Sequence, residues 1–97
     1  MTIDELKQMS LDALDDLKAE DITEIDVRGK TTVTDWIIVA TGTSSRHVKS
    51  IANSVVMAAK DEGKPALGVE GEAEGEWVLV DLNDVIVHLM LPQTRAC

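Results

Sequence analysis

The spacing of hydrophobic and polar residues changes several times along this chain, and each change marks an expected element. Apolar residues in residues 2–20 recur every three or four positions, which is typical of an amphipathic helix. This stripe contains Ile3, Leu6, Ser10, Ala13 and Leu17, widened by Leu11 and Leu14. Thr2 and Glu5 have the spacing of a capping box, in which each side chain accepts a hydrogen bond from the other's backbone amide. We therefore predict an N-terminal helix that ends just before Asp21.

Two strands are expected next. Residues 22–27 place Ile25 and Val27 on one face, with Glu24 and Asp26 on the other, before a turn at residues 28–30. Residues 36–41 (WIIVAT) are apolar on both faces, which predicts a central strand covered on both sides.

A second amphipathic helix follows the GTSS segment at residues 42–45. Its buried stripe is expected at Val48, Ile51, Ala52, Val55, Val56 and Ala59. Gly63 and Pro65 are helix-ending residues. Residues 66–70 are expected to form a short strand, and the strand–helix–strand order predicts a parallel pair, joined by a right-handed connection, with residues 36–41.

The last two strands are predicted at residues 76–82 and 85–91, joined by a two-residue turn at Asn83 and Asp84. In that register Leu82 pairs with Val85, and both faces of the hairpin are fixed. One face is wholly apolar and is expected to be core: Val78, Val80, Leu82, Val85, Val87, Leu89 and Leu91. The other carries Trp77, Leu79, Asp81, Ile86, His88 and Met90, a mixture typical of binding surfaces.

These elements, in the order α-β-β-α-β-β-β, predict a mixed α/β (α+β) fold. We expect a single domain over residues 1–97, with about five strands in a mixed sheet. Residues of the core must be aliphatic, because the chain has no Phe or Tyr and two Trp.

Charge narrows the choice of partner. Eighteen acidic and nine basic residues give a net charge of −9, which disfavours direct nucleic-acid binding and favours a basic protein partner. The single cysteine, Cys97, has no internal partner, and the sequence contains no secretory signal or membrane-length apolar run. We therefore expect a soluble protein of a reducing compartment, the cytoplasm.

Candidate sites for chemistry are weak. The Thr43–His47 loop could hold an anion with help from Arg46 and Lys49, although N-capping by Thr43 or Ser44 is the favoured interpretation. Asp81 and Asp84 could form a metal pair, but a solvated turn shaped by Asp84 fits better. His47 and His88 lack metal spacing and are expected at the surface. We predict no catalytic residue, cofactor or metal.

The strongest local signal is acidic. Glu70, Glu72, Glu74 and Glu76 precede Trp77 within a segment that holds eight carboxylates and one lysine between Asp61 and Asp84. Such a run is often only a solvated face, but an exposed tryptophan beside it favours a docking site.

Several segments resemble, in order and spacing, the ribosomal silencing factor family, also called Iojap-like. They are DVRGK, TDWIIVATGTSSRHVKSIA, LGVEGE and GEWVLVDLNDVIVHLMLPQTR, which together cover most of residues 21–95. Family members continue past the TR pair into an aromatic, leucine-rich tail, whereas this chain stops at Cys97, so contacts made by that tail are not expected here.

The resemblance implies a nucleotidyltransferase-like fold without nucleotidyltransferase activity. It also implies that the protein docks on a basic large-subunit ribosomal protein, the fourteenth in standard order. The docked protein would block association of the two subunits and repress translation during starvation. Relatives in organelles support ribosome assembly, and some members are homodimers. Two alternatives therefore stay open, a large-subunit assembly factor and a divergent nucleotide-binding enzyme.

Under this hypothesis the acidic residues Glu70, Glu72 and Glu76 steer the basic partner and Trp77 anchors it. Leu79, His88 and Met90 would line the apolar patch, with Asp81 pairing a Lys or Arg at its edge.

Overall fold

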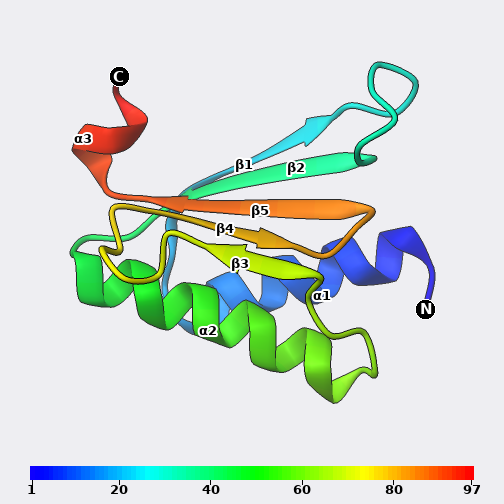
Figure 1. Ribbon diagram of the computed structural model, residues 1–97, viewed down its shortest axis with the longest axis horizontal. Coiled ribbons are helices and arrows are strands. Elements are labelled where there is room, and N and C mark those ends of the chain that lie inside the picture. The colour runs from blue at the N-terminus through cyan, green and yellow to red at the C-terminus, as the bar shows by residue number, and fades with distance from the viewer.

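The computed structural model describes residues 1–97 as one five-stranded mixed sheet with two long helices on one face (Figure 1). The elements are α1 (Ile3–Asp16), β1 (Glu20–Asp26), β2 (Trp36–Thr41), α2 (Ser45–Asp61), β3 (Gly68–Glu70), β4 (Trp77–Asp81), β5 (Val85–Met90) and α3 (Pro92–Arg95). The strand order is β1-β2-β5-β4-β3. The predicted mixed α/β class and element order are confirmed, and the short α3 is an addition. None of the three helices has the length and apolarity needed to cross a membrane.

The first helix begins as predicted and ends earlier than predicted. The capping box is present, because Thr2 and Glu5 each accept a hydrogen bond from the other's backbone amide. The helix stops at Asp16, since Lys18 takes a left-handed conformation with φ of 58°. The amides of Lys18 and Ala19 then bond back to the last turn, which satisfies its free carbonyls. Asp21 consequently lies inside β1.

The second helix follows the predicted signals closely. The Ser44 hydroxyl accepts the His47 amide at 3.1 Å, so N-capping at this junction is confirmed. Gly63 ends the helix with φ of 70°, and its amide bonds to the carbonyl of Lys60. The predicted stripe is buried, except that Val56 is only partly buried.

The core lies between these two helices and the inner face of the sheet. It contains the aliphatic stripes of α1 and α2 and the inner residues of β2, β4 and β5. Val78, Val80, Leu82, Val85, Val87 and Leu89 are at most 7 % exposed, as the hairpin register predicted. Leu91 lies just after β5 and is half-buried, so it borders the core rather than joining it. Burying one such side chain fully stabilises the fold by about 1.5–3 kcal/mol.

Two predictions about β2 are wrong. β2 does not pair with β3; it pairs in parallel with β5, and β3 is an edge strand antiparallel to β4. β5 is suited to the middle of the sheet because it is almost wholly apolar, whereas three residues with Gly68 and Glu70 suit an edge.

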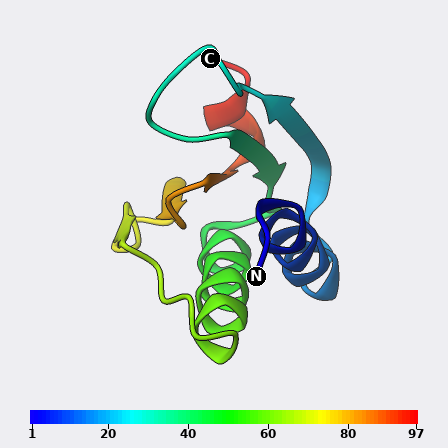
Figure 2. The same cartoon turned by 90° about the vertical axis from the view of Figure 1, so that its right-hand side faces the viewer.

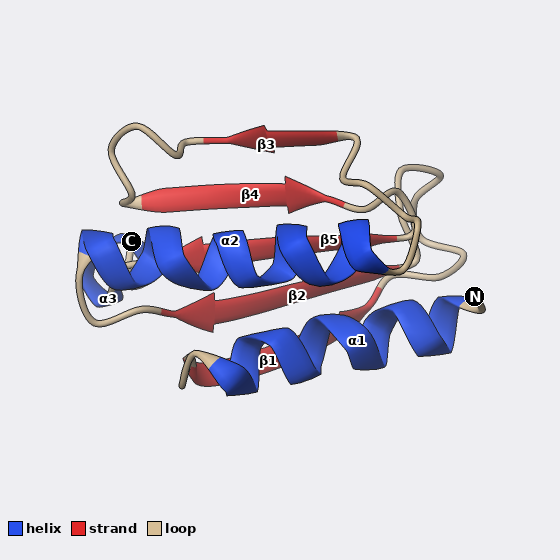
Figure 3. Cartoon of the chain, turned by 90° about the horizontal axis from the view of Figure 1, so that it is seen from below, coloured by secondary structure: helices blue, strands red, loops and turns tan.

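β2 is also not covered on both sides. Figures 2 and 3 show α1 and α2 side by side on the same face of the sheet. The opposite face carries only the short α3, at one end (Figure 1). Ile37 and Val39 point to that side and are half-buried rather than buried.

Candidate docking surface on the open face of the sheet

The face of the sheet turned away from α1 and α2 is the candidate site, and we call it the open face. Paired residues on neighbouring strands share a face, so the register defines its members. They are Thr23 and Ile25 of β1, Ile37, Val39 and Thr41 of β2, Ile86, His88 and Met90 of β5, Trp77, Leu79 and Asp81 of β4, and Gly68 and Glu70 of β3. The predicted mixed face of the hairpin is therefore confirmed as the solvent side.

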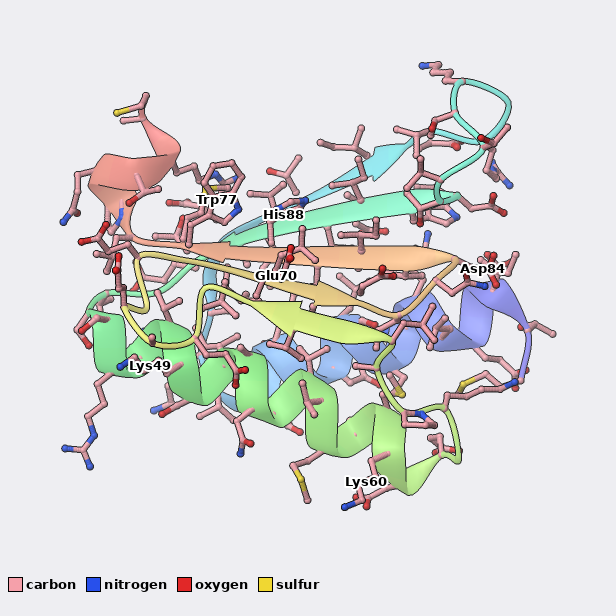
Figure 4. All side chains as sticks on the ribbon, in the orientation of Figure 1. Lys49, Lys60, Glu70, Trp77, Asp84 and His88 are labelled. Atoms are coloured by element: carbon pink, nitrogen blue, oxygen red, sulfur yellow. The ribbon has the colours of Figure 1, made fainter.

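Trp77 is the most prominent apolar group of this surface. It starts β4 opposite Met90 and is 53 % exposed. Its indole Nε1–H donates to Nδ1 of His88 at 2.9 Å, and the two rings are 5.9 Å apart (Figure 4). Three shallow hollows border its ring, one of them formed with Met90 and α3. A large ring is thus held in a fixed orientation with much of its surface in water.

The other tryptophan shows what a structural tryptophan looks like here. Trp36 is half-buried at the start of β2, and Nζ of Lys7 lies 3.7 Å from its ring centre. The guanidinium of Arg28 lies 5.1 Å from the same ring. Cations of its own chain therefore cover Trp36, whereas the ring of Trp77 is left exposed to solvent.

His88 is placed on the expected face but is not a simple surface imidazole. It pairs with Leu79 on one side and Val39 on the other, and it is half-buried. Burial lowers its pKa below the usual 6.5, because the charged ring is poorly solvated there. The neutral ring accepts the hydrogen bond from the Trp77 indole N–H at Nδ1, so its own proton is on Nε2.

The acidic residues divide between a strand and a fixed loop. Glu70 is exposed on β3, opposite Leu79. The loop of residues 71–76 is closed by a hydrogen bond from the Gly75 amide to the Gly71 carbonyl at 3.1 Å. Nζ of Lys49 on α2 donates to the Ala73 carbonyl at 3.0 Å and ties the loop to the helix.

Gly75 explains why this loop lies so close to α2. It is buried with φ of 68°, and a Cβ there would lie 2.8 Å from the Ser45 carbonyl oxygen and from Cε of Lys49. With the backbone fixed in this way, Glu72, Glu74 and Glu76 are all exposed, and Glu74 and Glu76 line a hollow together with Trp77. The loop presents a cluster of negative charge at one end of the open face.

Asp81 lies apart from this cluster. It is four residues along β4 from Trp77, about 13 Å at the usual strand rise. Its Oδ1 accepts the Asn83 amide at 2.8 Å, so Asp81, rather than Asp84 as predicted, shapes the turn with its side chain. The structure therefore brings together Trp77, Leu79, His88, Met90 and the glutamates, and leaves Asp81 at the far end.

Sequence reasoning missed part of the surface. Ile37, Val39 and Ile25 extend its apolar area across β2 to β1, and Ile25 is 41 % exposed. Arg95 of α3 was also missed; it donates to Thr23 Oγ1 at 2.8 Å, to Thr41 Oγ1 at 3.0 Å and to the Asp21 carbonyl. The sequence signal for this extension of the open face was the apolar character of residues 36–41 on both faces. The pattern can be interpreted only with the strand order, which places β2 between β1 and β5.

The Thr43–His47 loop connects the start of α2 to the end of α1 through hydrogen bonds of His47. Nδ1 of His47 accepts the Thr43 amide at 2.8 Å, and its Nε2 bonds to the Leu17 carbonyl at 2.7 Å. His47 lies in the first turn of α2, as expected, and is partly exposed, but its ring also links the start of α2 to the end of α1. Two of the amides that could hold an anion, those of Thr43 and His47, already have partners. No cluster of three or more His, Cys, Asp or Glu side chains is arranged to hold a metal ion.

Comparison with known proteins decides the family. The sequence model described as "Ribosomal silencing factor during starvation" matches residues 1–97. This chain belongs to the ribosomal silencing factor family. A ribosomal silencing factor of Chromobacterium violaceum is 47 % identical over 95 residues, which is 98 % of this chain and 78 % of that protein. A crystal structure from the same organism superposes with a TM-score of 0.97 at 47 % identity, covering 99 % of this chain and 80 % of that one.

The family extends into organelles. A mouse protein named "Mitochondrial assembly of ribosomal large subunit protein 1" is 34 % identical over 80 residues, 79 % of this chain and 35 % of the mouse protein. The family resemblance expected from the sequence is therefore confirmed, and so is the mixed α/β fold.

Proposed function

We propose that this silencing factor represses translation by docking its open face on a basic large-subunit ribosomal protein, the fourteenth in standard order. The docked factor occupies the surface that the small subunit needs, so the two subunits cannot join. We place this activity in the cytoplasm, with no catalytic step, cofactor or metal; a homodimer stays a prediction.

Glu70, Glu72 and Glu76 attract the partner, Trp77 anchors it, and Leu79, His88 and Met90 form the apolar patch around the anchor. Asp81 at the far end pairs a basic side chain of the partner.

One observation carries the proposal: an exposed, hydrogen-bonded tryptophan stands beside a fixed acidic loop on the only sheet face without long helices. Aromatic anchors surrounded by polar groups are typical of binding hot spots. Negative charge beside the anchor complements a basic ribosomal protein and speeds its encounter.

The direct test is co-sedimentation with purified large subunits. Trp77→Ala should weaken binding by about 30- to 1,000-fold, corresponding to the ~2–4 kcal/mol of an aromatic hot spot. The variant should fold normally, because the side chain is mostly outside the core. Leu67→Ala is the matched control, since Leu67 is 70 % exposed but lies outside the open face.

Subunit joining is the second readout. Wild-type protein should reduce the light-scattering signal when large and small subunits are mixed, and Trp77→Ala should not. Equal binding of Trp77→Ala and wild type to the large subunit would refute the docking assignment.

A role in large-subunit assembly is the second candidate, and the name of the mouse relative favours it. Both roles use the same surface, so the mutations above do not distinguish them. The distribution of the factor does: silencing predicts that it co-sediments with mature large subunits, whereas assembly predicts that it is enriched on immature ones.

A further inference from the structure

The largest hollow in the molecule lies on the opposite side from the open face. It is a groove lined by residues of α1 and α2 on their surface that faces away from the sheet. Figure 3 shows these two helices side by side in front of the sheet. The two helices approach closely because small residues meet between them: Ser54 Oγ donates to the Ala13 carbonyl at 3.0 Å. Larger side chains on either side of this contact then form the walls of the groove.

Methionines are concentrated here. Three of the four in the chain, Met1, Met9 and Met57, line the groove, and only Met90 lies on the open face. Met57, on α2, is a large apolar side chain that is 46 % exposed. Methionine is flexible and polarisable, and it is common where a protein surface accepts an apolar helix.

Charge defines the kind of occupant. Five carboxylates line the groove, those of Glu5, Asp12, Asp16, Asp61 and Glu62. Two basic side chains line it, and the ammonium of one of them, Lys49, donates a hydrogen bond to the Ala73 carbonyl of the acidic loop. The net negative rim repels nucleic-acid phosphates and anionic lipid, and it favours Lys or Arg beside an apolar stripe.

The same charge argues against this chain itself as the occupant. A second copy also carries a net charge of −9. An extended strand is disfavoured too, because both walls of the groove are helices, which offer no free backbone edge for strand pairing.

We propose that the α1–α2 groove is a second docking surface, which accepts a basic amphipathic helix of another protein. The apolar stripe of that helix lies on Met9 and Met57, and its basic residues reach the carboxylates of Asp12 and Asp61. Because the groove and the open face are on opposite sides of the sheet, the factor can hold such a helix while it is docked on the ribosome. This proposal does not depend on the proposed function.

A model peptide tests it. The probe is a helix-forming peptide of about 18 leucines and lysines, with leucine at positions i, i+3, i+4 and i+7. Full-length protein carrying ¹³C-methyl methionine is titrated with it, and the methyl signals are followed by NMR. We expect saturable shifts at Met9 and Met57 and none at Met90, which serves as an internal control.

Variants distinguish specific binding in the groove from nonspecific attraction of the basic peptide to an acidic protein. Met57→Ala should weaken peptide binding at least fivefold, whereas Val33→Ala, at a side chain that is 68 % exposed elsewhere, should not change it. Asp61→Asn should weaken binding more than Glu20→Gln, which removes the same charge outside the groove. Met57→Ala should still co-sediment with large subunits.

Several results would overturn the second docking surface. They are shifts centred on Met90, equal affinity for a scrambled peptide of the same composition, equal effects of Met57→Ala and Val33→Ala, or no saturation by about 1 mM. None of these results affects the prediction for Trp77→Ala on the ribosome, so the two proposals fail separately.

Discussion

The two faces of the β4–β5 hairpin contain large apolar side chains in the same alternating positions but have different surroundings. On the inner face Val78, Val80, Val85, Val87 and Leu89 are fully buried under α1 and α2. On the outer face Trp77 is half in water, and Leu79, Ile86, His88 and Met90 are half-buried. Apolar character on a strand therefore does not by itself indicate core.

Polar atoms mark the difference between the two faces. The inner face of the hairpin has none in its side chains, whereas the outer face carries an indole N–H, an imidazole and a carboxylate. Those groups bond to one another or to the turn and remain open to water. The inner face serves stability, and the outer face is the one proposed to serve binding, so substitutions on the two faces should have separable effects.

The largest expected effect comes from a matched pair of leucines. Leu89→Ala on the inner face should lower the free energy of unfolding by about 2–5 kcal/mol, because it leaves a cavity in the core. Leu79→Ala on the outer face should cost about 1 kcal/mol, since water replaces the missing atoms. Urea unfolding followed by circular dichroism measures both.

Binding should show the reverse order. At a temperature where both variants remain folded, Leu79→Ala should weaken large-subunit binding and Leu89→Ala should not. Similar losses of stability in the two variants would contradict the assignment of one face to the core and the other to docking.

Local patterns in the sequence were sufficient for this division of faces. The turn at Asn83, where φ is 75°, fixes the register, and alternation then assigns every residue of the hairpin. The capping box at Thr2 and the glycine after α2 are equally local, and both were predicted.

What could not be predicted depends on contacts between distant segments. The hairpin inserts β5 and β4 between β2 and β3, and no short-range signal specifies that order. Residues 36–41 are apolar on both faces, but only the strand order shows that Ile37 and Val39 belong to the open face. The bond between His47 and the Leu17 carbonyl joins residues thirty positions apart, and only the folded chain brings them together.

Charge reversal should have an intermediate effect, confined to the outer face. Glu70 and Glu76 are exposed and make no salt bridge, so Glu70→Lys with Glu76→Lys should leave stability nearly unchanged. The double variant should slow association with large subunits about tenfold or more, with a smaller change in dissociation, because exposed charges act mainly on encounter. Stopped-flow binding at low and high salt separates the two rates, and wild type should approach the variant as salt screens the charges. A change confined to dissociation would exclude steering.

The smallest expected effect is a pH dependence of the outer face, carried by His88. Its pKa is lowered by burial, so the unfolded chain, with a pKa near 6.5, binds a proton more readily than the folded one. The stability that depends on neutral His88 is present above about pH 6.5 and is lost as pH falls from there through the folded pKa. Protonation also removes the acceptor of the Trp77 indole N–H, which frees the anchor ring. Unfolding free energies of wild type and His88→Gln should therefore converge as pH falls below 6.5. If the two curves stay parallel between pH 7.5 and 5, the buried neutral ring does not contribute to stability in this way.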